Sequence, residues 1–300
     1  MKDYLRELRA FVAVAETGHF TRAAERLDLS QSVLSAAVGK LEALLGTRLF
    51  DRHTRQCRLT ASGAALLPDA SRMVNEWDRL VASARDLQGL ATGRVSIAAP
   101  TAQCAYLLPP LLHEFQDAHP GVKVTVHDVP EQQVHELVRN GVADLGIATE
   151  TDARSDLSAT PFYSDQYIAA LPPGHPLARR RSLEWRQVAE HPIIGPLPEN
   201  PVRRHLDLRL AREGVRLNYV HEVSLPWTMA GLVHAGLGLA VLTVALRPLI
   251  ESRQLVAKPI GRPTLSRSLV VLRPAKRGLS PQAAALRDVV TGRRLRADQR

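Results

Sequence analysis

Apolar side chains recur at helical spacing through the first sixty residues. The pattern opens with a stripe that ends at a glycine, formed by Leu5, Leu8, Val12, Ala15 and Gly18. Thr21 is placed to cap a second helix, and residues 28–30 interrupt the pattern before a third helix begins near Gln31. The third helix has its own inner stripe and stop, formed by Leu34, Val38, Leu41, Leu45 and Gly46. Two helices separated by so short a break predict a helix-turn-helix, whose second helix enters the major groove of DNA.

The outer face of this third helix carries polar and small side chains, with Gln31, Ser32 and Ser35 facing away from the apolar stripe. A glutamine amide can bond an adenine edge in two places, and serine hydroxyls can contact bases or phosphates. A short helical bundle with an ordinary polar surface is the alternative interpretation. The polar face nevertheless favours DNA binding, because a second basic feature follows directly.

Residues 49–52 and 58–60 predict two short strands around a turn at 53–56. Arginines lie along this hairpin at Arg48, Arg52, Arg55 and Arg58. A basic hairpin beside a recognition helix indicates a wing that contacts phosphates or the minor groove. Solvated surface arginines are the alternative for any one of these positions.

Several runs follow one another in a recognisable order: Phe20–Leu27, Leu29–Ser35, Lys40–Glu42, Leu44–Gly46, Leu49–Arg52 and Arg58–Gly63. Together they resemble the winged helix-turn-helix of LysR-type transcriptional regulators, without a gap over about 60 residues. The resemblance implies DNA contacts from Gln31, Ser32, Ser35 and Arg52. The residues that we expect to contact DNA are Thr21, Arg22, Gln31, Ser32, Ser35, Lys40, Arg52 and Arg55. Many members have a proline near Gln31–Ser32 and a larger polar residue at Ala36, so we expect more readout through the wing and through DNA shape.

Residues 61–92 predict one long helix with apolar positions spaced 3-4-3-4-3, namely Leu67, Ala70, Val74, Trp77, Val81 and Ala84. Such spacing is typical of a seam between two helices, although a single stripe can equally pack on its own domain. The resemblance favours the seam, because family members dimerise through this helix. We therefore expect a homodimer or homotetramer whose DNA-binding domains, residues 1–60, bind a partly palindromic promoter site on double-stranded DNA. An activator of this kind would also contact RNA polymerase.

Strands and helices alternate from residue 93 to residue 300. The expected strands are 95–97, 122–126, 144–148, 167–171, 193–194, 218–223, 239–242, 255–259 and 269–272. The expected helices are 107–119, 134–139, 202–212, 227–234 and 281–290. This order predicts an α/β domain, or a pair of subdomains, with mostly parallel sheets.

The resemblance extends into this region and implies a two-lobed effector-binding domain, similar to a periplasmic binding protein. Lobe one would comprise residues 93–163 and 267–300, and lobe two would comprise residues 164–266. Two crossover strands would join the lobes, with a ligand cleft between them. Thr243 stands where a proline is usual.

A small-molecule effector is expected where the strands end, because helix N-termini there offer free N–H groups that favour anions. The candidate ligand-binding residues are Pro100, Thr101, Gln103, Val129, Pro130, Gly195, Pro196, Trp227 and Thr228. Thr101 and Thr228 supply hydroxyls and Trp227 supplies an aromatic face, with helix capping and core packing as the alternatives. An organic anion is one candidate effector, with His127 and Arg203 as charge partners.

The formal charge of +9 is concentrated towards the ends, with +3 in residues 1–60, −2 in residues 61–261 and +8 in residues 262–300. The first value agrees with a DNA surface, whereas the last has no motif beside it and suggests a solvated tail. Cys57 and Cys104 make no disulfide framework, and the charged start lacks a secretion signal, so we expect a cytoplasmic protein. Residues 223–246 are long enough for a membrane span, but Pro226 and three glycines predict a buried helix, turn and strand instead.

Catalytic motifs are absent from the sequence, which has no HExxH, paired CxxC, GxSxG or P-loop. We therefore expect no enzyme activity and no cofactor or metal. The expected function is a ligand-responsive, sequence-specific transcriptional regulator. A constitutive DNA-binding regulator whose second domain only oligomerises is the alternative.

Overall fold

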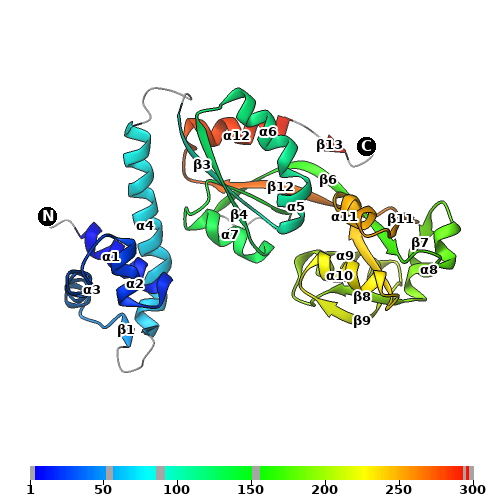
Figure 1. The fold of residues 1–300 in the computed structure, drawn as a ribbon, viewed down its shortest axis with the longest axis horizontal. Helices are drawn as coiled ribbons and strands as arrows, with labels where there is room; N and C mark the ends of the chain where they lie inside the picture. The colour runs from blue at the N-terminus through cyan, green and yellow to red at the C-terminus, as the bar shows by residue number, and fades with distance from the viewer. Residues whose placement is uncertain (1–3, 52–56, 86–91, 151–155, 293–294, 297–300) are drawn as a thin grey trace. The chain divides into compact units, whose positions relative to one another are not determined.

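A computed structural model describes residues 4–51, 57–85, 92–150, 156–292 and 295–296 (Figure 1). Arg52 and Arg55, two of the expected DNA contacts, lie outside these residues. The chain divides into two compact units, one formed mainly by residues 1–88 and the other by most of residues 89–300. We call them the N-terminal and C-terminal units.

The N-terminal unit is made of helices and a small hairpin. Its elements are α1 Leu5–Thr17, α2 Phe20–Arg26, α3 Gln31–Leu45, β1 Phe50–Asp51, β2 Arg58–Leu59 and α4 Ala61–Arg85. Gly18 and Gly46 end α1 and α3 with φ of 64° and 65°, the left-handed conformation that glycine adopts without strain. The hydroxyl of Ser30 caps α3 by accepting a hydrogen bond from the Val33 N–H at 3.3 Å. The predicted start and stop of α3 are therefore confirmed.

The predicted cap of α2 is wrong. Nδ1 of His19 accepts a hydrogen bond from the Thr21 N–H at 3.2 Å, and α2 begins at Phe20. His19 has extended backbone angles, which let its ring reach the free N–H of the first turn as a serine or threonine cap would. Thr21 lies inside the helix, and its hydroxyl is available for another partner.

The wing is attached to the recognition helix through one carboxylate. Oε1 of Glu42 in α3 accepts hydrogen bonds from the N–H groups of Leu49 at 2.8 Å and Phe50 at 3.3 Å. The Phe50 ring lies 5.5 Å from Phe11 of α1 and is fully buried in the core of this unit. The two strands are shorter than predicted, with Phe50 opposite Leu59.

Half of the stripe on α4 packs inside its own unit. Ala70 and Val74 are 1% and 8% exposed in the core that also contains α1. Met73, Trp77 and Leu80 are instead 57%, 47% and 61% exposed. The prediction of a partner seam is therefore wrong for Ala70 and Val74, because spacing identifies an apolar face but not what covers it. The exposed apolar face is the Met73–Trp77–Leu80 stripe.

The C-terminal unit is α/β. Its strands are β3 Gly93–Ala99, β4 Val122–Asp128, β5 Leu145–Thr149, β6 Leu157–Leu171, β7 Leu183–Glu184, β8 Pro192–Pro196, β9 Asn218–Val223, β10 Leu239–Thr243, β11 Val256–Gly261, β12 Ser266–Pro274 and β13 Leu295–Arg296. Its helices are α5 Thr101–Tyr106, α6 Leu108–Ala118, α7 Glu131–Arg139, η1 Pro176–Arg179, α8 Trp185–Ala189, α9 Pro201–Arg212, α10 Pro226–His234, η2 Val244–Leu246, α11 Arg247–Ser252 and α12 Pro281–Gly292. The expected elements are all present: the helix expected at 107–119 is α6, and α5 is a further short helix that was not expected.

Each lobe has a parallel core, and two long antiparallel strands join the lobes. The strand order is β4-β3-β5-β12-β6-β10-β8-β9. β3 is parallel to β4 and β5, and β8 is parallel to β9 and β10. β6 and β12 pair with each other in antiparallel fashion and run from one lobe into the other (Figure 1). The expected mostly parallel sheet is thus correct within each lobe and wrong at the crossovers.

The structure also bears on two further expectations, one for the basic end of the chain and one for the apolar stretch at residues 223–246. Residues 295–296 pair with β6 beside Tyr163, so part of the basic end of the chain extends the sheet and is not only a solvated tail. Within the described ranges, no helix is both long and apolar enough to cross a membrane. Residues 223–246 form α10, a turn and β10, the helix, turn and strand that were predicted.

Candidate DNA-binding and effector-binding sites

The recognition helix presents its expected polar residues to solvent. Gln31 and Ser32 are exposed in the first turn of α3, and Ser35 is half-buried one turn later. The hydroxyl of Thr21 in α2 donates a hydrogen bond to Oε1 of Gln31 at 3.2 Å. Because a carbonyl oxygen has two lone pairs, this contact leaves the amide both a donor and an acceptor for a base edge. Thr21 therefore fixes the orientation of the exposed Gln31 amide.

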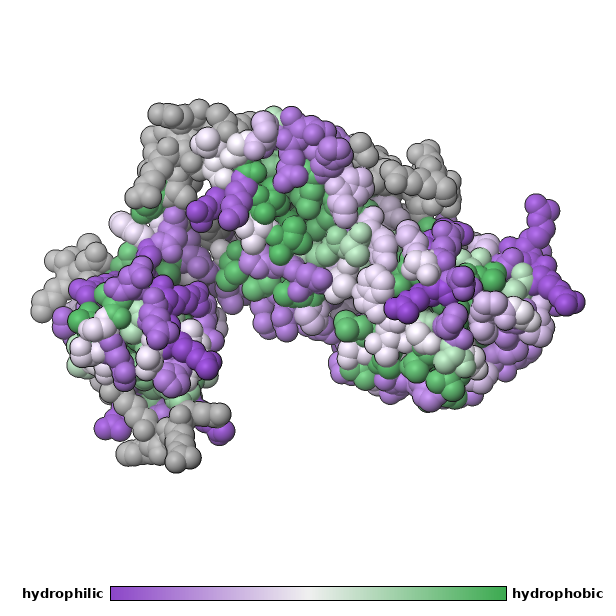
Figure 2. All heavy atoms as spheres, in the orientation of Figure 1, coloured by the Kyte–Doolittle hydropathy of each residue, from purple (hydrophilic) through white to green (hydrophobic). Residues whose placement is uncertain are grey.

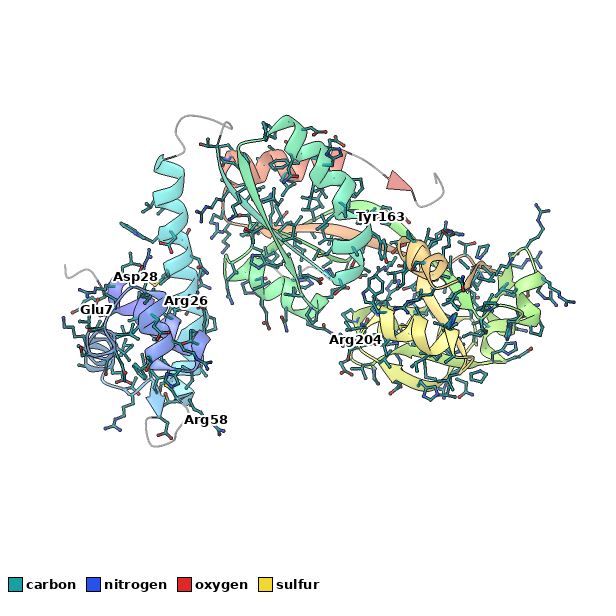
Figure 3. The ribbon with its side chains drawn as sticks, in the orientation of Figure 1. Glu7, Arg26, Asp28, Arg58, Tyr163 and Arg204 are labelled. Carbon is teal, nitrogen blue, oxygen red and sulfur yellow. The ribbon has the colours of Figure 1, made fainter. Side chains whose placement is uncertain are left out.

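Two other expected DNA contacts and a further arginine of the wing are exposed on the same unit. Arg22 and Lys40 are exposed on α2 and α3, and Arg58 is exposed on the second wing strand (Figure 3). The Ser32 hydroxyl lies 3.0 Å from the capping hydroxyl of Ser30, which holds it at the start of the helix. The first turn of α3 thus exposes polar side chains, and the same unit exposes cations of the kind that bind phosphates.

In lobe one, the expected ligand residues gather where β3 and β4 end. Pro100 caps α5, and Thr101 begins it. The Thr101 hydroxyl donates a hydrogen bond to Oδ1 of Asp128 at 2.7 Å. Val129 and Pro130 follow Asp128 directly, so both expected segments lie at one edge of the sheet. Asp128, which sequence reasoning did not single out, gives this edge a carboxylate.

In lobe two, Gly195 and Pro196 line a small recess with Tyr167, Arg203 and Tyr219. A Cβ at Gly195 would lie 2.3 Å from the Tyr219 ring, so only glycine leaves room for that ring. The Arg203 guanidinium lies 3.9 Å above the same ring. The Tyr219 hydroxyl donates to Asp207 at 2.8 Å, and burial raises the pKa of Tyr219, so this hydroxyl keeps its proton.

The two lobes touch through a hydrogen bond and a ring contact. Nε2 of Gln132 in α7 donates to the Glu199 carbonyl of lobe two at 3.2 Å. The rings of Tyr106 in α5 and Trp227 in α10 have centroids 6.2 Å apart. Trp227 therefore contacts a side chain of lobe one with its ring tilted by 38°, and Thr228 is exposed beside it.

A buried polar cluster joins the lobes at the crossover strands. Asp165 of β6 and Arg267 of β12 are direct partners in the register, are 0% and 4% exposed, and form an ion pair at 3.2 Å. Arg267 also donates to the Thr149 hydroxyl at 3.2 Å, and Glu131 accepts the Thr149 N–H at 2.8 Å. With its amide oriented to satisfy both groups, Gln103 accepts from Arg267 at 2.9 Å.

Several buried polar atoms of this cluster lack a hydrogen-bond partner among the described residues. They are the Tyr167 hydroxyl, the Thr243 hydroxyl and Nε of Arg267. Burial raises the pKa of Tyr167 to about 12, so its hydroxyl is a neutral donor. Because an unpaired buried polar group costs about 1–3 kcal/mol, such groups mark places that a bound molecule or water completes.

Of this cluster, sequence reasoning singled out Gln103 as a site residue and missed the groups around it, although two signals were present. Thr243 had stood out as a departure from the usual proline, and its hydroxyl is one of the unpaired groups. Asp165 and Arg267 lie within two residues of the expected lobe boundaries and carry opposite charges. Their pairing across 102 positions of sequence depends on strand register, which local patterns do not reveal.

Two families of known proteins match this chain, one in each unit. The family described as "Bacterial regulatory helix-turn-helix protein, lysR family" matches residues 5–64, and the family described as "LysR substrate binding domain" matches residues 88–294. The chain is 33% identical over 290 residues to a protein of Shigella flexneri described as an uncharacterized HTH-type transcriptional regulator, YfeR, covering 97% of this chain and 94% of that protein.

The chain belongs to the LysR family. It is accordingly a DNA-binding transcriptional regulator with an N-terminal winged helix-turn-helix and a two-lobed effector-binding domain.

Solved structures of the LysR family share the fold. Full-length OxyR from Pseudomonas aeruginosa matches with a TM-score of 0.76 at 22% identity, covering 98% of this chain and 96% of that one. Full-length CbnR complexed with its target DNA matches with a TM-score of 0.74 at 19% identity, covering 97% and 99%. The YfeR relative is described as a transcriptional regulator rather than as an enzyme.

Proposed function

We propose that this LysR-family regulator reads its operator through α3 and the wing, and that a small molecule bound between the lobes controls the reading. The domain boundaries are residues 1–60 for the winged helix-turn-helix, 61–92 for the linker helix and 93–300 for the effector domain. The chain acts in the cytoplasm, where its DNA partner is found, and has no catalytic role of its own.

The operator contacts follow from the Thr21–Gln31 hydrogen bond, which holds one exposed amide in place on the first turn of the recognition helix. Gln31, Ser32 and Ser35 face the bases, while Arg22 and Lys40 bind phosphates. Arg52 and Arg55 remain expected contacts from the wing.

The effector site rests on one observation: unpaired, deeply buried polar atoms of Tyr167, Thr243 and Arg267 lie where the two crossover strands join the lobes. A ligand that hydrogen-bonds there also reaches the strand ends that carry Thr101 and Gly195. Binding would favour one arrangement of the lobes over another, which is the means by which a ligand shifts a population.

The charges of this region favour a neutral or cationic polar effector over an organic anion. Arg203 already meets Glu222 at 2.6 Å and Asp207 at 3.4 Å. Arg267 is paired with Asp165, and the exposed carboxylate of Asp128 holds the Thr101 hydroxyl. A carboxylate ligand would therefore find the charge of both guanidinium groups already balanced by a carboxylate, with Nε of Arg267 as an N–H unpaired among the described residues, and would be repelled by the carboxylates beside them.

Thermal shift with matched panels tests the site and the charge of its ligand together. The panels compare small carboxylates with the corresponding amides and amines. A ligand present at 100 times its Kd raises the free energy of unfolding by about 2.7 kcal/mol. We expect stabilisation from the amide or amine panel, and less of it in Thr101→Val. Stabilisation by carboxylates alone, abolished by Arg204→Gln, would show that the exposed Arg204 of α9 receives an anion (Figure 3). Absence of any stabilising compound, with DNA binding intact, would favour a constitutive regulator.

The exposed Met73–Trp77–Leu80 stripe is the surface through which we propose that a second copy of the chain binds. Apolar side chains this exposed along one helix are rarely left to solvent, and a pair of DNA-binding units suits a partly palindromic operator.

A further inference from the structure

One corner of lobe two carries a concentration of arginines. Arg179, Arg180, Arg181 and Arg186 are exposed on η1, the segment before β7, and α8. None of these four side chains has an ion pair or hydrogen bond within the described part of the chain. Strongly hydrophilic side chains project from the β7–α8 end of the unit (Figures 1 and 2). We call this surface the arginine corner.

The backbone beneath the arginine corner is held firmly. Trp185 is 1% exposed, and its indole N–H donates to the Pro263 carbonyl at 2.9 Å. Leu183 of β7 is buried and pairs with Ile260 of β11. The arginines therefore extend from an ordered platform, so ordering the backbone adds little to the cost of binding.

Carboxylates do not balance the arginine corner. Glu184 forms an ion pair with Arg262 at 3.0 Å, which leaves Glu190 as the other acidic side chain between residues 172 and 191. Four cations within eight residues thus face solvent with little compensation. Such a concentration repels itself and is stabilised by a polyanion.

The arginine corner has the composition of a nucleic-acid surface rather than of a protein interface. Residues 172–191 include no large apolar side chain among the exposed ones. Protein interfaces are built around buried apolar and aromatic anchors, whereas DNA interfaces are polar and strongly positive. The planar guanidinium forks match phosphate oxygens in two places at once.

We propose that the arginine corner binds the phosphate backbone of DNA flanking the operator. This contact is independent of base sequence and is separate from base reading by α3. Residues 1–60 carry a net charge of only +3, so arginines on lobe two add substantially to the charge that releases counterions from DNA. The regulator would then hold a longer stretch of DNA than its winged domains read.

The test uses the full-length protein and an operator selected by the protein itself from random DNA. One duplex contains the operator alone, and a second extends it by several helical turns of random sequence on each side. Arg179→Gln, Arg180→Gln and Arg181→Gln are combined in one variant. A control variant combines Arg216→Gln, Arg253→Gln and Lys276→Gln, which removes the same charge from scattered exposed positions.

We expect the arginine-corner variant to bind the short duplex as the unchanged protein does. On the long duplex its affinity should fall by about tenfold or more, and its salt dependence should weaken by about two to three counterions. The control should lose much less. Equal affinity and equal salt slope on both duplexes would overturn the proposal, as would an equal loss in the control. Unchanged DNA binding combined with lost transcription in a reconstituted reaction would also overturn it, and would assign the corner to an acidic protein.

Discussion

At the scale of single residues, one hydrogen bond fixes the direction of a side chain that we propose reads the operator. Gln31 is exposed and polar, as many surface residues are, but the Thr21 hydroxyl fixes one end of its amide at 3.2 Å. The outward direction of Gln31 was predictable from helical spacing, and Thr21 was also expected among the DNA contacts. Their mutual hydrogen bond was not, because Thr21 had been assigned to capping and the cap is His19.

Thr21→Val should therefore weaken base reading without weakening the fold. Gln31→Ala should reduce the free energy of operator binding by about 1–3 kcal/mol at one base position and relax specificity there. We expect Thr21→Val to produce a smaller loss at that same position and no loss on random DNA. Binding of operators substituted at each base, measured for both variants, checks this. A loss spread evenly over all positions would show that Thr21 contacts phosphate instead.

Cys104 is a residue of a reactive type whose surroundings keep its thiol in the unreactive, protonated form. Its thiol donates to the Ala99 carbonyl at 3.2 Å, and burial together with the nearby Asp128 carboxylate raises its pKa to about 12. A raised thiol pKa means that the neutral form persists through pH 7 to 10, and only the thiolate is nucleophilic.

In Cys57→Ala, the alkylation rate of the remaining thiol should therefore rise about tenfold per pH unit up to pH 10, without levelling near the ordinary cysteine pKa of about 8.5. Alkylation followed by mass spectrometry measures the rate, with Cys104→Ala as the comparison that reports on Cys57. A plateau near pH 8 to 9 in Cys57→Ala would show an accessible, ordinary thiol.

At the scale of elements, local patterns predicted most helices and strands, and long-range packing decided the rest. α3 begins at Gln31 and β9 spans Asn218–Val223, as predicted, because capping and alternation are local. The Asp165–Arg267 part of the crossovers was missed, since its stability comes from pairing two distant strands. α4 was predicted as a helix, but Ala70 and Val74 of its apolar stripe pack in the core of their own unit and not against a partner. Likewise, the expected site residues lie at strand ends as predicted, whereas the buried cluster between the lobes required the fold.

Paired substitutions on α4 separate its two faces. Val74→Ala removes buried methyl groups from the core of the N-terminal unit and should destabilise that unit by about 1–3 kcal/mol while leaving self-association unchanged. Trp77→Ala should leave unfolding nearly unchanged and weaken the dimer by at least about 2 kcal/mol, as an exposed aromatic anchor would. Chemical denaturation and sedimentation equilibrium give the two quantities. If Trp77→Ala sediments as the unchanged protein does, the exposed stripe is not the dimer surface.

At the scale of the whole molecule, function depends on linking two units that each have their own core. Within the C-terminal unit, β6 and β12 carry the buried Asp165–Arg267 pair from one lobe towards the other (Figure 1). Removing one partner of such a buried pair leaves an uncompensated charge, so the pair holds β6 and β12 in this register. A ligand that completes the unpaired groups beside this pair would change the balance between arrangements of the lobes.

The operator dissociation constant, measured against increasing concentration of the most stabilising compound from the thermal-shift panels, tests this account most directly. A coupling free energy of about 1–3 kcal/mol between the effector site and the DNA site predicts that the operator dissociation constant changes by roughly 5- to 150-fold at saturating compound. Thr101→Val should move the midpoint to higher compound concentration and preserve the size of the change, because it alters ligand binding and not the coupling. An operator affinity that stays constant at saturating compound would contradict a ligand-controlled regulator.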